Sequence, residues 1–422
     1  ILGDSGSRAM VTESLYAAVA AQAVEEAGST LALRVSVDRG ACGFDALDEL
    51  PTAMGSDSAG SVLLYTSGTS GCPKGVVSTL LKPGAPLEAV AVGAAKLGSA
   101  LGIPEQGRAM LVGPWYHSGQ LFFSLYPLLR GCSLVMRRKF DPEETLDLID
   151  THEVTIAHLV PTQFIRMLRV APQRRAAFRG DSLSRVWHGG SACPPEVKQA
   201  MIDWWGPVLV EYYAATESGI VTLIDSPAWL KKKGSVGRPA TPGQVAIVGE
   251  DGCELGHGQE GRIAIRLAPG RRLEYANAPD KTAAAYVVPD AFTVGDVGYL
   301  DEDGYLFLTA RSAEVIVSGG MNIYPAEVEG VLLAHWAVRD AVVIGVPDEE
   351  FGEQVKALVE AEPGASGHDL PAVLDVHCRA QLAGFKVPRS YEVVAQLPRE
   401  PTGKIARQPL REPYWAGAGR RI

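Results

Sequence analysis

A segment rich in glycine and hydroxyl side chains, residues 65–75 with the sequence YTSGTSGCPKG, has the composition of a phosphate-binding loop. Its glycines let backbone N–H groups converge, its hydroxyls add hydrogen-bond donors, and Lys74 adds one cation. It is not a Walker A loop, because no Gly-Lys-Ser/Thr stands four residues after a glycine. The alternative is a surface linker, but the segment directly follows an apolar stretch. The residues predicted to bind a polyphosphate are Thr66, Ser67, Gly68, Thr69, Ser70, Gly71 and Lys74.

The segment EYYAATE, residues 211–217, is a second candidate. Open α/β sheets bind ligands at the carboxyl ends of their strands, where two aromatic rings, a hydroxyl and a carboxylate would here come together. An aromatic ring can cover a purine, and Glu217 could hold magnesium, which prefers oxygen ligands. Taken alone, the same segment would be an ordinary strand end with a surface carboxylate.

Two further polar residues lie on segments framed by glycine or by proline and glycine. Asp296, in the sequence VGDVGY, could accept hydrogen bonds from the hydroxyls of a ribose. Lys404, in the sequence EPTGKI, could move in as a point charge against a developing transition state at phosphorus. The alternatives are a β-turn aspartate and a solvated surface lysine.

Short apolar strands alternate with helical patterns around the first two motifs. Because strands that alternate with helices of 10–15 residues form βαβ units, we expect a mostly parallel sheet. The expected helices are 13–27, 87–101, 119–130, 142–151, 161–170 and 194–204, and the expected strands are 32–37, 61–65, 108–113, 133–137, 155–160, 184–188 and 208–211.

The pattern of long helices and strands ends near residue 234. Short strands at 243–248, 262–266 and 305–309, punctuated by Gly and Pro, predict a compact β-subdomain. Residues 256–261, GHGQEG, match G-x-G-x-x-G but precede a strand instead of opening a helix, so we interpret them as a turn. Beyond a boundary near residues 311–314, the pattern predicts an α+β domain with helices 325–334 and 370–382 and strands 338–346, 354–361 and 390–396.

Composition narrows the function classes. The 422 residues carry 39 basic and 49 acidic side chains, a formal net charge of −10, which argues against nucleic acid as the main partner. No stretch approaches the roughly 18–20 apolar residues of a membrane span. The six cysteines are scattered with no C-x-x-C pair, as is typical of a reduced, cytoplasmic protein.

In this order, the motifs resemble those of the acyl-adenylate-forming superfamily, which includes acyl-CoA synthetases, adenylation domains of peptide synthetases and beetle luciferases. The resemblance runs from about residue 8 to 410 and is closest to acyl-CoA ligases. It implies an α/β large domain over 1–311, with βαβ-type sheets to 233 and a small β-barrel-like subdomain over 234–311. A small, mobile α+β C-terminal domain would follow over 312–422. Family members carry roughly a hundred residues more at the N-terminus, so we expect that portion of the fold to be missing here.

The resemblance also implies a two-step reaction that uses ATP, magnesium and coenzyme A. A carboxylate would attack the α-phosphate to give an acyl-adenylate, and a thiol would then displace AMP after the C-terminal domain rotates. Catalytic roles fall to Lys404, Thr216, Glu217 (also the metal ligand) and His117. Adenine would lie between Tyr213 and the segment Gly189, Gly190 and Ser191, the ribose would be held by Asp296 and Arg311, and pantetheine would pass Ser318, Gly319 and Gly320.

The acyl pocket is expected near the segment PWYH, residues 114–117, which resembles the family's aromatic-histidine segment. No aspartate stands where an amino-acid-activating relative would meet an ammonium, so we predict a fatty, aromatic or polycyclic acid. Each pocket candidate could equally be plain core. They are Tyr116, His117, Phe122, Val160, Phe164, His188, Ala214 and Ala215.

The chain departs from the family pattern at the hinge. Ala313 stands where Asp or Lys is usual, so the balance between the two domain orientations is expected to differ. Ala313 motivates one alternative, an enzyme dominated by thioester formation from a preformed adenylate. Two others stay open: acyl transfer to the phosphopantetheine of a carrier protein, and a non-catalytic nucleotide-binding relative. A homodimer is expected from the family.

Overall fold

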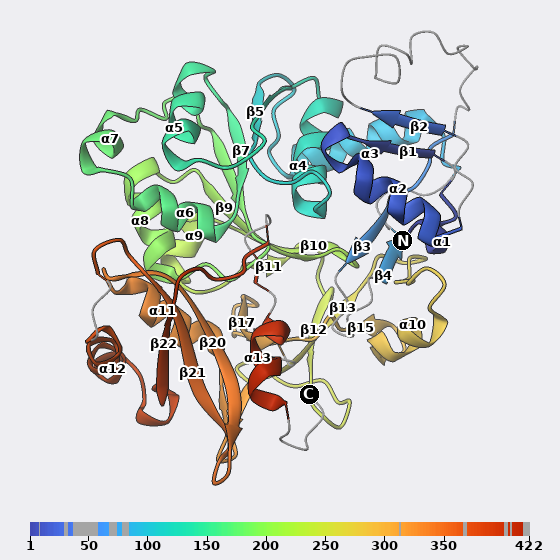
Figure 1. Ribbon diagram of the computed structural model, residues 1–422. Helices are drawn as coiled ribbons and strands as arrows, with labels where there is room; N and C mark the ends of the chain where they lie inside the picture. Colours follow the sequence, from blue (N-terminus) through green and yellow to red (C-terminus); the bar gives the residue numbers. More distant parts are fainter. Residues whose placement is uncertain are drawn as a thin grey trace. The chain divides into compact units, whose positions relative to one another are not determined.

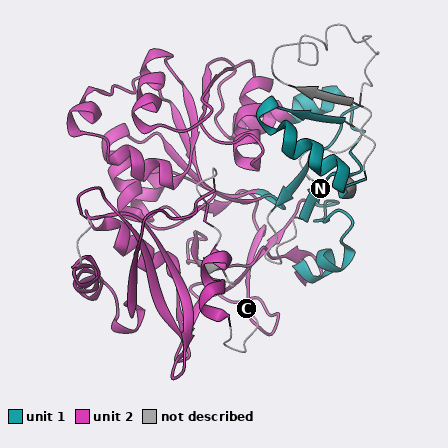
Figure 2. Ribbon diagram, viewed as in Figure 1, with its two compact units in different colours: residues 1–93, 216–219, 269–285 teal, residues 94–215, 220–268, 286–422 magenta. Residues whose placement is uncertain are grey.

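A computed structural model describes most of the chain. The described residues are 1–7, 9–28, 33–36, 58–66, 74–77, 84–311, 314–365, 369–400, 404–405 and 407–416. They divide into two compact units (Figure 2). Unit 1 contains residues 1–93, 216–219 and 269–285, and unit 2 contains residues 94–215, 220–268 and 286–422.

Unit 1 is built on two small strand pairs. Strand β1 (Ala9–Thr12) runs parallel to β2 (Leu33–Ser36), and β3 (Leu63–Thr66) pairs antiparallel with β4 (Lys74–Val77). The register of the second pair sets Thr66 opposite Lys74, so both ends of the predicted phosphate loop are fixed by one ladder. The other elements are α1 (Leu2–Ser5), η1 (Ser14–Tyr16), α2 (Ala17–Glu26), α10 (Pro279–Ala285) and the first half of α3 (Leu87–Ala100).

Unit 2 begins with a seven-stranded sheet in the order β11-β10-β9-β8-β7-β5-β6 (Figure 1). The pairs β6–β5, β5–β7, β7–β8 and β8–β9 are all parallel, which confirms the predicted α/β class. The strands are β5 (Arg108–Leu111), β6 (Ser133–Met136), β7 (Ile156–Leu159), β8 (Arg185–His188), β9 (Leu209–Ala215), β10 (Gly219–Asp225, whose Gly219 belongs to unit 1) and β11 (Arg238–Pro239).

Helices cover both faces of this sheet. On one face, α5, α6 and α8 pack Leu146, Phe164 and Met201 into a core with Leu159. On the other face, α4 packs Phe123 and Tyr126 against Trp187 and Tyr212. The helices are α4 (Ser118–Leu129), α5 (Pro142–Thr151), α6 (Pro161–Leu168), α7 (Pro172–Ala177), α8 (Pro195–Trp205) and α9 (Ser226–Lys231).

Local sequence explains where these helices begin. The Asp141 carboxylate accepts a hydrogen bond of 2.9 Å from the backbone N–H of Glu144, and Pro142 occupies the first helical position of α5. A carboxylate cap followed by proline is a strong helix start, because it satisfies an unpaired N–H and presets φ. Proline also opens α6, α7 and α8, directly after a strand or a short loop.

The predicted β-subdomain is a six-stranded sheet in the order β14-β15-β13-β16-β17, with β12 also paired to β13. Its pairings β12–β13, β13–β15, β13–β16, β14–β15 and β16–β17 are antiparallel, and residues 256–260 precede β13 with a turn at 257–258, as the sequence predicts. Its strands are β12 (Val245–Val248), β13 (Gly261–Arg266), β14 (Tyr286–Val288), β15 (Ala291–Phe292), β16 (Asp296–Leu300) and β17 (Leu306–Arg311).

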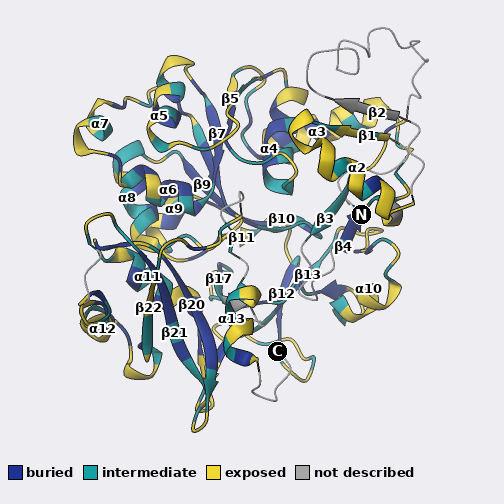
Figure 3. Cartoon of the chain, in the orientation of Figure 1, coloured by how far each residue is buried: buried dark blue, intermediate teal, exposed yellow. Residues whose placement is uncertain are grey.

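The C-terminal part folds around its own core. Strands β20 and β21 form a long antiparallel pair that is buried along much of its length (Figure 3). Helices α11 and α12 pack Val328, Leu332 and Leu374 on one side of it. The elements are β18 (Ile316–Ser318), β19 (Met321–Ile323), α11 (Pro325–Ala334), β20 (Val338–Asp348), β21 (Gly352–Ala361), α12 (Leu370–Gln381), η4 (Gly384–Lys386), β22 (Ser390–Val394) and α13 (Arg407–Trp415).

Among the described residues, none of the helices has both the length and the apolar character required to cross a membrane.

Candidate active site

Four predicted residues in the described part of unit 1 belong to the phosphate loop or the metal motif, namely Thr66, Lys74, Thr216 and Glu217. Thr66 ends β3 and Lys74 begins β4, while Ser67, Gly68, Thr69, Ser70 and Gly71 lie outside the described residues. The Lys74 ammonium lies over the ring of Tyr275, 5.0 Å from its centroid. The Tyr275 hydroxyl donates a hydrogen bond of 3.0 Å to Oε1 of Glu217.

Tyr275 was not predicted from the sequence. Its ring connects the cation of the phosphate loop with the predicted metal ligand, although the residues lie far apart in the chain. Burial, followed by the negative charge of Glu217, raises the pKa of Tyr275 well above its usual value, so the hydroxyl keeps its proton and acts as a donor. The only sequence signal was an aromatic residue in the stretch LEYAN.

The donors in unit 1 fit magnesium better than a softer metal. Glu217 supplies a carboxylate and Thr216 a hydroxyl, which are hard oxygen ligands. Within the described part of the chain, no group of three or more His, Cys, Asp and Glu side chains could hold a metal ion. Magnesium in nucleotide sites takes one or two carboxylates and the phosphates themselves, so one carboxylate is sufficient.

In unit 2, Tyr213 and Asp296 meet directly. The Tyr213 hydroxyl donates to Oδ2 of Asp296 at 2.7 Å, and each residue is only 7% exposed. The register of β16 and β17 sets Asp296 opposite Arg311, so the two predicted ribose residues are neighbours in the ladder. A carboxylate has about four lone-pair positions, which suits the predicted role of Asp296 as an acceptor for a diol.

The predicted adenine segment follows β8. Gly189 is buried against β9, and a Cβ there would stand 2.6 Å from the carbonyl oxygen of Tyr212. Gly190 has φ of +81°, which favours glycine, and both Gly190 and Ser191 are exposed. Glycine is therefore needed for the close approach of the two strands, while the next two residues stay accessible.

His117 caps helix α4 and lies near Lys404. Its Nδ1 accepts a hydrogen bond of 3.3 Å from the backbone N–H of Gly119. Burial, with a smaller contribution from the charge of Lys404, lowers the pKa of His117 to about 4. The segment of Lys404 is held by a bridge between Arg399 and Ile405 and by the N–H of Glu400, which donates to the Lys404 carbonyl at 2.8 Å.

Pocket candidates separate into two groups. Phe164 and His188 are fully buried on the face of the sheet covered by α5, α6 and α8, with ring centroids 5.2 Å apart. Val160 caps α6 on the same side. Tyr116 is 69% exposed, and three others are partly buried near α4 or the end of β9: Phe122, Ala214 and Ala215.

A pair that the sequence did not reveal lies beside His117. Nε2 of His158 and the Tyr212 hydroxyl share a hydrogen bond of 2.6 Å, and Phe123 stacks on His158 with centroids 4.7 Å apart. A Cβ on Gly119 would stand 3.0 Å from the Tyr212 hydroxyl oxygen. Burial, followed by the charge of His117, lowers the pKa of His158 to about 3, so both histidines are neutral near pH 7.

The predicted pantetheine residues form the turn between β18 and β19. Gly319 and Gly320 have φ of +57° and +78°, and Ser318 ends β18. A Cβ on Gly319 would stand 2.9 Å from the Phe351 ring. This tight turn accounts for the two glycines by backbone geometry, and the pantetheine role stays a prediction.

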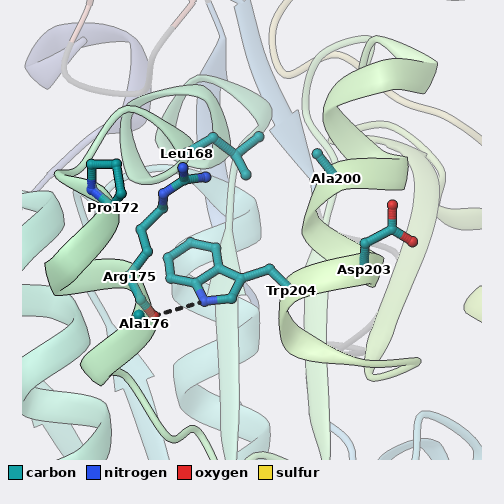
Figure 4. A pocket seen from close by; sticks show the side chains of 7 residues that line it. All are labelled: Leu168, Pro172, Arg175, Ala176, Ala200, Asp203 and Trp204. Atoms are coloured by element: carbon teal, nitrogen blue, oxygen red, sulfur yellow. Dashed lines mark hydrogen bonds between the residues drawn. The ribbon is translucent and has the colours of Figure 1, made fainter.

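A surface hollow of about 390 Å³ lies between α6, α7 and α8 (Figure 4). The Trp204 indole N–H donates to the Arg175 carbonyl at 3.2 Å within it. It contains none of the predicted site residues. Its lining consists of Leu168, Pro172, Arg175, Ala176, Ala200, Asp203 and Trp204.

Two models of one enzyme family match successive parts of the chain. The model of the family "AMP-binding enzyme" matches residues 1–270, and the model "AMP-binding enzyme C-terminal domain" matches residues 327–404. The long-chain-fatty-acid–CoA ligase FadD13 of Mycobacterium tuberculosis is 33% identical over 421 residues, which are 99% of this chain and 80% of that protein. The fatty acid–[acyl-carrier-protein] ligase ScoC of Streptomyces coeruleorubidus is 34% identical over 85% of this chain and 68% of its own.

Solved structures of CoA synthetases are also similar to this chain. The o-succinylbenzoate CoA synthetase MenE of Bacillus subtilis, in complex with its acyl-adenylate intermediate, superimposes with a TM-score of 0.78 and 27% sequence identity. The superposition covers 97% of this chain and 79% of the other.

Proposed function

Because the chain belongs to the family of AMP-binding enzymes, we propose that it is an ATP-dependent acyl-CoA ligase for a hydrophobic carboxylic acid. The predicted membership of the acyl-adenylate-forming superfamily and the class of an AMP-forming acid–CoA ligase agree with these relatives. The observation that carries the proposal is the match of both family models along the chain, together with the 33% identity to the ligase FadD13 over 99% of this chain.

The first step joins two anions. A carboxylate oxygen attacks the α-phosphorus of ATP, the bond to pyrophosphate breaks, and an acyl-adenylate forms. The Lys404 ammonium would offset the repulsion between carboxylate and phosphate in the space beside His117. Neutral His117 adds no second positive charge there, so it would line the acyl group and not compete for the phosphate.

Nucleotide binding is assigned to the residues that the sequence motifs select. Tyr213 would pack on the adenine while its hydroxyl orients Asp296 for the ribose. Lys74 and the loop that precedes it would hold the phosphates, together with Thr216. Glu217 would hold the magnesium ion, which lowers the negative charge of the triphosphate.

In the second step, a thiol sulfur attacks the acyl carbonyl carbon and AMP leaves with the bonding electrons. We propose coenzyme A as the thiol and the turn at Ser318, Gly319 and Gly320 as its approach. A second candidate is the phosphopantetheine of a carrier protein, which is favoured by the 34% identity to the carrier-protein ligase ScoC. Ala313, which motivates an enzyme dominated by thioester formation, lies outside the described residues.

Several broader expectations belong to the same proposal. The division into a large domain to residue 311 and a mobile C-terminal domain from 312 is supported by the separate core of α11, α12, β20 and β21. A cytoplasmic location, a homodimer and the absence of a nucleic-acid partner stay predictions, the last one resting on the net charge of −10.

The test is pyrophosphate release without any thiol, with magnesium-ATP and a panel of fatty, aromatic and polycyclic acids. We expect release with one class of acid, and thioester formation on later addition of coenzyme A. Thioester formation with a phosphopantetheinylated carrier and not with coenzyme A would support the second candidate. No release with any acid, from a folded protein that binds AMP, would contradict the ligase proposal and favour a non-catalytic nucleotide-binding protein.

A further inference from the structure

Tyr275 is the point where three separate stretches of unit 1 meet. Its hydroxyl donates to Oε1 of Glu217 at 3.0 Å, and its ring faces the Lys74 ammonium at 5.0 Å. The residue is 6% exposed, so this aromatic side chain is enclosed and not a surface group that contacts its neighbours by chance.

The backbone fixes the ring against strand β4. Residues 274–276 pair with β4 through a bridge between Val76 and Tyr275 and through the N–H of Ala276, which donates to the Gly75 carbonyl at 2.8 Å. The N–H of Tyr275 donates to the hydroxyl of Thr282, in the middle of α10, at 3.0 Å. The ring therefore moves with the strand that begins at Lys74.

These contacts leave Glu217 able to bind a metal ion and restrain Lys74, which is predicted to bind a polyphosphate. A carboxylate has two oxygens with about four lone-pair positions, so a bond to Oε1 leaves Oε2 of Glu217 able to bind a metal ion. Groups that hold a metal's ligands from behind orient them and strengthen binding. A cation over an aromatic face is attracted to it, so the ring also restrains Lys74.

We propose that Tyr275 is a positioning residue that sets Glu217 for the magnesium ion and Lys74 for the phosphates of the same nucleotide. The inference rests on the proposed function in one respect, namely that Glu217 holds the magnesium of ATP. Tyr275 itself touches neither the nucleotide nor the reacting carboxylate, and acts through its two neighbours.

The decisive variant is Tyr275→Phe, which keeps the ring under Lys74 and removes only the bond to Glu217. Binding of Mn²⁺ with a non-hydrolysable ATP analogue, followed by the paramagnetic resonance signal of free Mn²⁺, is measured without any acid. We expect roughly tenfold weaker metal binding, the lower end of the effect of groups behind a metal ligand. In the Glu217→Gln background, the same substitution should change metal binding by less than about twofold, because its effect passes through Glu217.

The C-terminal part offers a matched control. The Tyr414 hydroxyl donates to Oε2 of Glu392 at 2.7 Å, and Lys356 lies 4.9 Å from the centre of its ring. Tyr414→Phe therefore removes a bond of the same kind beside a lysine of the same kind, outside the proposed nucleotide site. It should leave Mn²⁺ binding unchanged.

A second variant, Tyr275→Leu, removes the ring as well. It should weaken binding of the nucleotide without metal severalfold, whereas Tyr275→Phe should not, since only the ring restrains Lys74. In assays of pyrophosphate release, Tyr275→Phe should raise the magnesium concentration needed for half-maximal rate, with a smaller effect on the rate at saturating magnesium.

Equal metal binding by Tyr275→Phe, Tyr414→Phe and the unaltered protein would overturn the proposal. An undiminished effect of Tyr275→Phe in the Glu217→Gln background would also overturn it, because the hydroxyl would then act elsewhere. A different result would contradict the proposed function alone. In that case the protein binds Mn²⁺ and the analogue with an affinity that depends on Tyr275, but releases no pyrophosphate with any acid.

Discussion

At the scale of single residues, burial sets the charge of the groups around the proposed acyl site. His117 and His158 both have a lowered pKa, to about 4 and about 3, mainly because burial disfavours the charged imidazole. Lys404 and His117 also carry like charges when protonated, which adds to the shift of His117. Near pH 7, the cation available to the reacting anions is then the lysine, not the histidine.

The buried histidine His158 makes stability depend on pH in a definite direction. Its folded-state pKa lies below the unfolded value of 6.5, so on acidification the unfolded chain binds a proton first. The stability that neutral His158 contributes is fully present above pH 6.5 and is lost progressively as the pH drops toward 3. Between pH 7 and pH 5 we expect this histidine alone to reduce the free energy of unfolding by about 2 kcal/mol.

Urea unfolding at pH 7 and pH 5 measures this loss, with His158→Gln as the comparison. The variant lacks the titrating group, so its free energy of unfolding should fall by less over the same interval. The same pH dependence in both proteins would contradict the assignment of a low pKa to His158.

At the scale of elements, helix α8 is joined to strand β9 by a buried ion pair. Nζ of Lys198 lies 2.7 Å from Oε2 of Glu211, and the two side chains are 0% and 6% exposed. Burial lowers the pKa of Lys198 and raises that of Glu211, while their mutual attraction opposes both shifts. Because Tyr213 lies two residues along the same strand, this pair helps to place the proposed adenine contact.

Lys198→Met should therefore destabilise the protein by about 3–5 kcal/mol, because it leaves an uncompensated carboxylate in the core. The double variant Lys198→Met with Glu211→Gln should recover much of that loss, since no charge then remains buried. Urea unfolding of the three proteins tests this. A double variant that is less stable than Lys198→Met alone would contradict the view that the unpaired charge is the main cost.

The elements also show which parts of the fold could be predicted from the sequence. Helix α11 spans residues 325–334 and α5 spans 142–151 as predicted, because proline, capping residues and apolar spacing are local signals. Strand β4 was not predicted, since KGVV becomes a strand only by pairing with β3. The bond between His158 and Tyr212 could not be predicted, because it depends on the register of β7, β8 and β9 over 54 residues.

The same distinction holds for the candidate site. Each of its sequence motifs is local, so Lys74, Glu217, Asp296 and Lys404 could be selected from residue type and spacing. Tyr275 could not, since its role depends on the pairing of residues 274–276 with β4. Phe164 and His188 show the converse limit: an apolar strand or helix pattern does not say which face of the sheet a side chain reaches.

At the scale of the whole molecule, unit 2 contains a contact between its α/β sheet region and its C-terminal part. Nη2 of Arg169 donates to the Val338 carbonyl at 2.6 Å, and Nη1 lies 3.0 Å from the Glu362 carboxylate. In the same arrangement Lys404 acts on His117. In the proposed mechanism this arrangement serves the first step, and rotation of the C-terminal part for thioester formation would break the Arg169 contact.

Arg169→Ala should accordingly slow adenylate formation severalfold and leave thioester formation from a supplied acyl-adenylate unchanged or faster. Single-turnover assays of the two half-reactions measure the ratio. Arg174→Ala is the matched control, because Arg174 pairs with Asp147 within the sheet region. A uniform loss of both half-reactions in Arg169→Ala alone would contradict a role in domain orientation.

The most direct test of the central claim compares the two half-reactions in Lys404→Ala. Loss of one preorganised charge at a developing transition state costs roughly 100- to 1,000-fold in rate. The account predicts a loss of that size in acid-dependent pyrophosphate release, with thioester formation from supplied acyl-adenylate largely kept. Equal loss of both half-reactions, or normal pyrophosphate release, would contradict the role given to Lys404 and the reaction built on it.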